Sequence, residues 1–245
     1  MIGLKLPARK RARDEAEKPF WISFADLMTA LMVLFLVAVT VALFAVTAKP
    51  PDPVSVKQAQ RERDIQKLLH EIADATKEYP GIRVRGHSIE FGDQALFPTN
   101  EHKFLVDKEH PAPDSKLRSF VSKVILTKAN DALGEKWLKR IVAEGFADQR
   151  GTYINNLNLS LQRSERVLCV LLASSKSVTD PLTEADRLQI RELFLVGGSS
   201  FNALKASLKE SRRIELRLEF LELDEIRQPS RDAPLDDAAC PLDSR

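Results

Sequence analysis

Glycine, cysteine and aromatic residues are scarce in this sequence. Among 245 residues there are nine glycines and two cysteines, and Phe, Trp and Tyr together make up 7%. Neither a Gly-rich phosphate-binding loop nor a G-x-S-x-G nucleophile elbow is present. The two cysteines and the four scattered histidines lack the spacing of zinc ligands. The sequence therefore gives no support for an enzyme, a cofactor or a metal site.

An excess of charge of one sign is also missing. The 37 Lys and Arg residues against 35 Asp and Glu leave a net charge of +2, and no basic patch is interleaved with aromatic side chains. We therefore expect no direct binding to nucleic acid.

One segment carries no charge at all, the run of 20 residues from Leu27 to Val46. As a helix it would be about 30 Å long, which matches the hydrocarbon core of a bilayer. The apolar region of a signal peptide is shorter, at about 7–15 residues, and ends in a small-residue cleavage site, whereas this run continues into the Pro-rich "TAKPPDPV". We predict a single transmembrane helix over residues 20–47.

The flanks of this run predict its orientation. Residues 1–19 form a basic tail, and Trp21 fits the aromatic belt at a membrane interface. Basic residues stay on the cytoplasmic side, so the N-terminus is expected inside a bacterial inner membrane and the larger C-terminal part in the periplasm.

Asp26 lies at the threshold of the apolar run, with Ile22, Phe24 and Ala25 extending the apolar surface on its cytoplasmic side. A carboxylate in such a place is expensive when charged, so it normally faces a partner or a wet cavity. It suits a site that alternates between the neutral and the ionised form. The hydroxyls of Ser23 and Thr29, one turn away on either side, could help to relay a proton. The alternative is that Asp26 caps the span by reaching the lipid headgroups.

The chain beyond the span divides into three parts. Residues 48–81 form a Pro-rich linker and an amphipathic helix, whose apolar stripe either pairs with a second copy, the interpretation we favour, or lies on the following domain. Residues 82–224 alternate strand and helix patterns and end in a strand of period two, which predicts an α+β domain. Residues 225–245 form an acidic tail that is expected to be flexible. The stripe consists of Ile65, Leu68, Leu69 and Ile72.

Both cysteines, Cys169 and Cys240, lie on the expected periplasmic side. In that compartment they can form a disulfide that would staple the tail. A buried free thiol at Cys169 and an unpaired Cys240 are the alternative.

The stretch "PFWISFADLMTALMVLFL" resembles the B subunit of MotAB-type stators. The single helix of that family begins with an aromatic Pro-Trp segment followed by F-A-D-L-M-T, which residues 24–29 reproduce. Its Asp is the proton-accepting residue, so the resemblance assigns proton transfer to Asp26.

The stretch "EGFADQRGTYINNLNLSLQRSERV", residues 144–167, resembles the signature of OmpA-like peptidoglycan-binding domains. The matching positions include Asp148, Asn156, Leu159 and Arg163, and the upstream "LFPTNEHKF" offers Asn100. Phe146 and Ala147 depart from the His and Thr that are common in the family.

These residues fit the diaminopimelate of a peptidoglycan stem, which presents an ammonium and a carboxylate on one carbon. The resemblance implies that Asp148 binds the ammonium and Arg163 the carboxylate in a bidentate manner. The amides of Asn156 and Asn100 would add hydrogen bonds. The alternative is an internal salt bridge between Asp148 and Arg163.

Together the two resemblances imply the B subunit of a proton-driven rotary stator and not an enzyme. Such a subunit forms a homodimer inside a pentamer of a multi-spanning MotA-like A subunit and grips peptidoglycan. The wording of residues 15–37 is most similar to B subunits of Zorya anti-phage defence motors. A flagellar MotB-type subunit and an OmpA-like wall anchor without transport are the alternatives.

Overall fold

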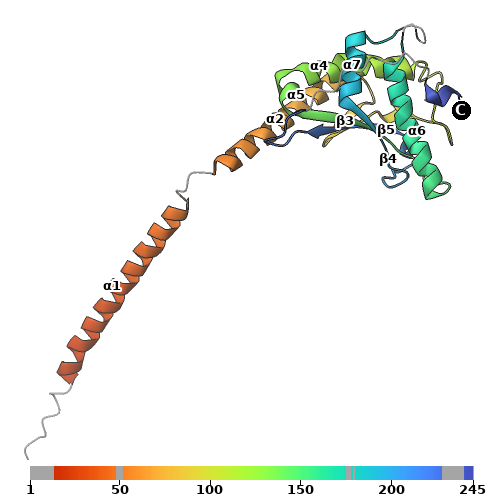
Figure 1. Ribbon diagram of the computed structural model, residues 1–245. Helices are drawn as coiled ribbons and strands as arrows, with labels where there is room; N and C mark the ends of the chain where they lie inside the picture. Colours follow the sequence, from red (N-terminus) through yellow and green to blue (C-terminus); the bar gives the residue numbers. More distant parts are fainter. Residues whose placement is uncertain (1–13, 48–51, 175–177, 179, 228–239, 245) are drawn as a thin grey trace, which may run out of the picture. The chain divides into compact units, whose positions relative to one another are not determined.

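The computed structural model describes residues 14–47, 52–174, 178, 180–227 and 240–244. The chain divides into two compact units, Met1–Pro53 and Val54–Arg245 (Figure 1). Most of the basic tail and residues 228–239 of the acidic tail lie outside the described residues.

The first unit contains helix α1, Asp14–Thr47. Its segment Ser23–Thr47 has a mean hydropathy of 2.8 and is the one described helix that is long and apolar enough to cross a membrane. Leu, Val, Ala and Phe dominate this segment, so its side chains offer an apolar surface in every direction. The predicted single apolar helix near the N-terminus is confirmed.

The second unit is built on a five-stranded sheet in the order β1-β2-β5-β3-β4. All neighbouring strands are antiparallel except β3 and β4, which are parallel. The predicted α+β class is confirmed, and the last strand lies near the end of the predicted domain, as expected. The bounds are β1 Arg83–Arg85, β2 Ser88–Glu90, β3 Leu138–Gly145, β4 Phe194–Gly198 and β5 Ile214–Phe220.

Helices connect and cover these strands (Figure 1). The parallel pair β3 and β4 is joined through α6, Tyr153–Leu172, and α7, Glu184–Leu193, because parallel strands need a long crossover. Before β3, a continuous helical stretch passes from α through π to α geometry. Its parts are α3 Pro113–Phe120, η3 Val121–Leu126 and α4 Thr127–Asn130, and the remaining helices are α5 Ala132–Trp137, α8 Leu208–Ser211 and the short η1 Thr76–Glu78, η2 Gly92–Ala95 and η4 Pro241–Ser244.

Helix α2, Pro53–Ala75, corrects the expectation of a pairing stripe. All four of its stripe residues are at most 6% exposed and belong to the same core cluster as the sheet. Polar contacts reinforce this packing, since Asp64 Oδ2 accepts hydrogen bonds from Trp137 Nε1 at 2.9 Å and from Lys136 Nζ at 3.0 Å. The stripe is therefore buried in the domain that follows it and is not free to pair with a second copy.

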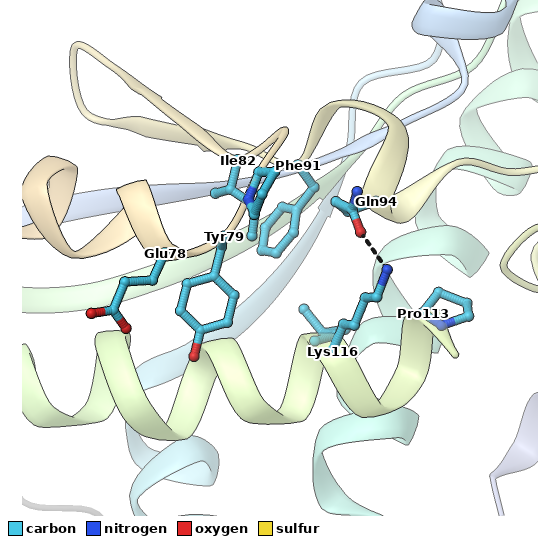
Figure 2. A pocket seen from close by; sticks show the side chains of 9 residues that line it. Glu78, Tyr79, Ile82, Phe91, Gln94, Pro113 and Lys116 are labelled. Atoms are coloured by element: carbon cyan, nitrogen blue, oxygen red, sulfur yellow. Dashed lines mark hydrogen bonds between the residues drawn. The ribbon is translucent and has the colours of Figure 1, made fainter. Parts of the chain in front are cut away.

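A cavity of about 350 Å³ lies where η1, which follows α2, meets the β1–β2 hairpin and α3. Figure 2 shows Tyr79 and Phe91 on its apolar side and the hydrogen bond from Lys116 Nζ to Gln94 Oε1, 3.0 Å long, on its polar side. None of the residues predicted to bind peptidoglycan lines it.

Candidate functional site

Asp26 lies on the exposed surface of α1. The Thr29 hydroxyl, expected as a helper, donates to the backbone carbonyl of Asp26 at 2.9 Å. This local bond satisfies the hydroxyl without involving the carboxylate. A shallow groove with a mostly apolar lining continues along α1 from Asp26 and Thr29 through Val33 to Val37.

The second candidate site lies where β3 ends and α6 begins. Strand β3 stops at Gly145, and the chain then turns through Asp148 to Gly151, whose φ of 93° suits glycine. Thr152 caps α6 by accepting a hydrogen bond from the backbone N–H of Asn155. Asp148 and the first turns of α6 are thereby held next to each other.

Gly145 of the signature is required by a close approach of two backbones. A Cβ atom at this position would lie 1.9 Å from the carbonyl oxygen of Ser160 in α6. Ser160 is fully buried, and its hydroxyl accepts a hydrogen bond from the backbone N–H of Ser200 at 3.0 Å. This part of the signature therefore sets how closely α6 packs on the sheet.

Asp148 is 5% exposed, and its carboxylate is held by two arginines. Arg150 donates to it from Nη2 at 2.6 Å and from its backbone N–H at 3.0 Å, and Arg212 Nη1 donates at 3.0 Å. The hydrogen bonds of Arg150, followed by those of Arg212, lower the pKa of Asp148 to about 2 against the opposing effect of burial. The group is therefore a fixed anion at neutral pH.

Arg163, in α6, is completely buried, with 0% of its surface exposed. Its guanidinium donates to three backbone carbonyls: Nε to Glu101 at 3.0 Å, Nη1 to Phe146 at 2.7 Å and Nη2 to Pro98 at 3.2 Å. Burial, and then the charge of Arg212, lower its pKa to about 10, so it stays a cation at neutral pH. Two of its five N–H groups are left over for another acceptor.

The other three predicted site residues occupy different places. Asn156 is 4% exposed and donates from Nδ2 to the carbonyl of Arg150 at 2.8 Å, so it shapes the turn beside Asp148. Asn100 is exposed in the loop after Pro98 and has a positive φ of 57°. Leu159 is half-buried on α6. Asn100 is thus the one of these three whose side chain is open to solvent.

The structure shows two site residues that the sequence did not indicate. Arg150 and Arg212 are the ion-pair partners of Asp148, and no ion pair joins Asp148 to Arg163 in the described part of the chain. The half-exposed Arg150 also donates to the Thr99 hydroxyl at 3.0 Å, so it spans from the turn to the loop that carries Asn100. A ligand approaching Asp148 therefore meets Arg150 first.

Arg166, one helical turn beyond Arg163, lies on a neighbouring face of the helix, for which the sequence predicts a solvated side chain. The structure differs, because Arg166 is 9% exposed and its Nη2 donates to Asp243 Oδ1 at 2.7 Å. Its partner lies in the short turn that follows Cys240.

Cys169 in α6 and Cys240 form a disulfide with a Cα–Cα distance of 5.4 Å. Of the two alternatives left open by the sequence, the structure has the paired one. No group of three or more His, Cys, Asp and Glu side chains is arranged to hold a metal ion in the described ranges.

Comparison with known proteins gives matches to both parts of the chain. Residues 8–45 match the family model described as membrane MotB of the proton-channel complex MotA/MotB. Over 230 residues, 93% of this chain and 91% of the relative, the sequence is 41% identical to the Zorya protein ZorB of Escherichia coli O139:H28 (strain E24377A / ETEC).

Solved structures with similar parts are more distant. The periplasmic domain of MotB, residues 64–256, is 13% identical with a TM-score of 0.37, covering 58% of this chain and 69% of that one. The cell wall anchor of the type VI secretion system (T6SS) from Pseudomonas aeruginosa is 18% identical with a TM-score of 0.36, covering 62% and 96%. The OmpA-like domain of FopA1 from Francisella tularensis is 15% identical with a TM-score of 0.31, covering 58% and 82%.

Proposed function

This chain belongs to the ZorB family of MotB-like proteins, and from that membership we propose that it is the B subunit of a proton-driven stator in Zorya anti-phage defence. The observation that carries the proposal is the 41% identity to ZorB over 93% of the chain, which includes both Asp26 and the Asp148 turn. The same identity favours the defence motor over a flagellar one.

In the membrane, Asp26 accepts and releases protons as its helix meets different faces of the A subunit. Each protonation state of the carboxylate prefers a different environment, so proton binding biases the contact that α1 makes. One proton crossing 100 mV releases about 2.3 kcal/mol, and several per turn suffice for mechanical work. The exposed apolar surface of α1 is the surface that the pentameric MotA-like subunit covers.

Outside the membrane, two copies of the domain bind peptidoglycan and keep the dimer from rotating with the A subunit. The diaminopimelate ammonium binds Asp148, displacing Arg150. The carboxylate binds the two N–H groups of Arg163 that remain, which requires the loop carrying Pro98 and Glu101 to shift because Arg163 is buried. Asn100 lies on the exposed part of that loop and contacts the stem peptide. In this arrangement the N-terminus is cytoplasmic and the domain is periplasmic.

The membrane half of the proposal is tested by Asp26→Asn, with Asp26→Glu as the matched control. Asn has the same shape but cannot be protonated and deprotonated, whereas Glu can. We expect Asp26→Asn to abolish protection against phage while the protein still inserts and co-purifies with the A subunit, and Asp26→Glu to keep partial protection. Full protection by Asp26→Asn would exclude the proton-transfer role.

The wall half is tested by sedimentation of the full chain with purified peptidoglycan. Asp148→Asn removes the charge that binds the ammonium, and Asp93→Asn removes an exposed carboxylate of η2 outside the site. We expect the first variant to lose sedimentation and the second to keep it. Equal sedimentation of Asp148→Asn and the unchanged protein would reject this site.

A further inference from the structure

The segment 240–244, the Cys240 turn, is fixed to the domain by three features, of which the disulfide and one hydrogen bond reach α6. The disulfide to Cys169 ties it covalently. Leu242 is buried to 1% exposure. Asp243 accepts the hydrogen bond from Arg166. A disulfide alone would keep the segment close to α6 without fixing its conformation. The buried Leu242 and the hydrogen bond to Asp243 also hold the Cys240 turn in a defined position.

The Cys240 turn also contacts the loop of residues 98–104. The partly buried imidazole of His102 lies beside the backbone of Leu242, and burial, followed by the neighbouring Arg166 charge, lowers the pKa of His102. His102 is therefore neutral at neutral pH, and it lies between the loop and the turn. Asp243 offsets the Arg166 charge at the same junction.

The loop 98–104 is in turn the main support of Arg163. Pro98 and Glu101, which accept hydrogen bonds from the guanidinium, both belong to it. Its base is fixed, since Phe97 and Phe104 stack with ring centroids 4.9 Å apart. The outer part, which includes Asn100, is held by Arg163 on one side and through His102 by the Cys240 turn on the other.

We propose that the Cys240 turn is a positioning element of the peptidoglycan site, which it influences through His102 and the loop 98–104. This inference rests on the proposed binding of peptidoglycan by Asp148 and Arg163. Without the turn, the loop samples more conformations, and binding must order it at a cost in affinity. Because disulfides form in oxidising compartments, the site reaches full affinity only after export.

The test uses the full chain in detergent and titrates it calorimetrically with the tripeptide L-Ala-γ-D-Glu-meso-diaminopimelate. In the variant Cys169→Ser/Cys240→Ser both thiols are removed together, so neither can pair between copies. We expect the dissociation constant to rise roughly three- to tenfold, as expected for a loop with one or two side chains left to be ordered. Asp243→Asn keeps the disulfide and should weaken binding less, with Asp243→Glu restoring it.

The control separates positioning from general stability. Asp64 lies on α2, and Asp64→Ala removes the hydrogen bonds that it accepts from Trp137 and Lys136. Figure 1 shows α2 at the opposite end of the domain from α6 and the Cys240 turn. It should lower the melting temperature without changing the dissociation constant. Unchanged binding by the double Ser variant, or equal weakening by Asp64→Ala, would overturn the proposal.

A second measurement keeps this proposal distinct from the proposed function. If the unchanged protein fails to bind the tripeptide, the wall-binding function fails, but hydrogen exchange of the ligand-free chain still reports on the loop. We expect the amides of residues 98–104 to exchange faster in the double Ser variant than in the unchanged protein. Equal exchange rates would show that the Cys240 turn does not position the loop.

Discussion

At the scale of single residues, Asp148 and Arg163 carry opposite charges in the candidate site but do not bind each other. Each of them binds other groups of the protein. Asp148 is held by two arginines, and Arg163 by three carbonyl groups. Charged groups held in this way stay ionised without forming an internal pair. Under the proposed function, a zwitterionic ligand finds both charges available once Arg150 and the loop 98–104 move aside.

We predict that Arg150→Ala tightens binding of the diaminopimelate tripeptide a few-fold. The guanidinium of Arg150 takes the place on Asp148 that the ligand ammonium needs, so its removal takes away a competitor. Calorimetric titration of the full chain measures the change, and Arg83→Ala, an exposed arginine of β1, controls for the lost charge. Weaker binding by Arg150→Ala would mean that Arg150 contributes to holding the ligand.

We also predict a pH window for the contribution of Asp148 to stability. Its folded pKa of about 2 lies below the ordinary 3.8, so this contribution is fully present above about pH 4 and disappears as the pH falls toward 2. It amounts to about 2 kcal/mol. Urea denaturation of residues 54–245 should show a constant difference between the unchanged protein and Asp148→Asn from pH 7 to 4, and a smaller one at pH 2.5. A difference that shrinks already between pH 7 and 5 would contradict the lowered pKa.

The sequence predicted the placement of Asp148 and Asn156 beside each other but not their neighbours. The spacing of residues in the 144–167 signature predicts only contacts within that turn and helix α6. Arg212 reaches Asp148 only because β5 lies beside β3, which places Arg213 against Phe146. Arg166 was expected in solvent because its partner, Asp243, lies 77 residues further along the chain.

At the scale of elements, α2 shows what an apolar stripe can and cannot predict. The spacing of Ile65, Leu68, Leu69 and Ile72 correctly predicted the helix, but a stripe does not identify the surface that covers it. Helix α7 was not predicted, since it is only 10 residues long and buries only Ile190 and Leu193. The strands were found because their alternation is set by one buried face.

We predict that Leu68→Ala lowers the free energy of unfolding of residues 54–245 by about 2–5 kcal/mol, because it leaves a cavity in a packed core. Leu68 is 1% exposed, whereas the neighbouring Lys67 is exposed and Lys67→Ala serves as the control. Urea denaturation measures both. Unchanged stability of Leu68→Ala combined with a loss of dimers would restore the pairing interpretation.

At the scale of the whole molecule, the sequence predicted the division into a span and a second unit, since hydropathy changes abruptly at about residue 48. It predicted the α+β class from the order of strand and helix patterns. It did not predict that the second unit begins as early as Val54, because α2 joins the core through contacts with residues far along the chain, such as Trp137.

The strand order has a mechanical consequence for a wall anchor under load. In the proposed function, tension between the membrane and a peptidoglycan chain bound at Asp148 enters the domain before β1 and leaves it after β3. In the sheet, β5 lies between β2 and β3 and is hydrogen-bonded to both. This strand also belongs to the covalent ring closed by Cys169 and Cys240, 71 residues apart. The last strand of the domain thus connects the other two, and the load cannot pull β2 away from β3 without breaking one of the two hydrogen-bonded ladders that flank β5.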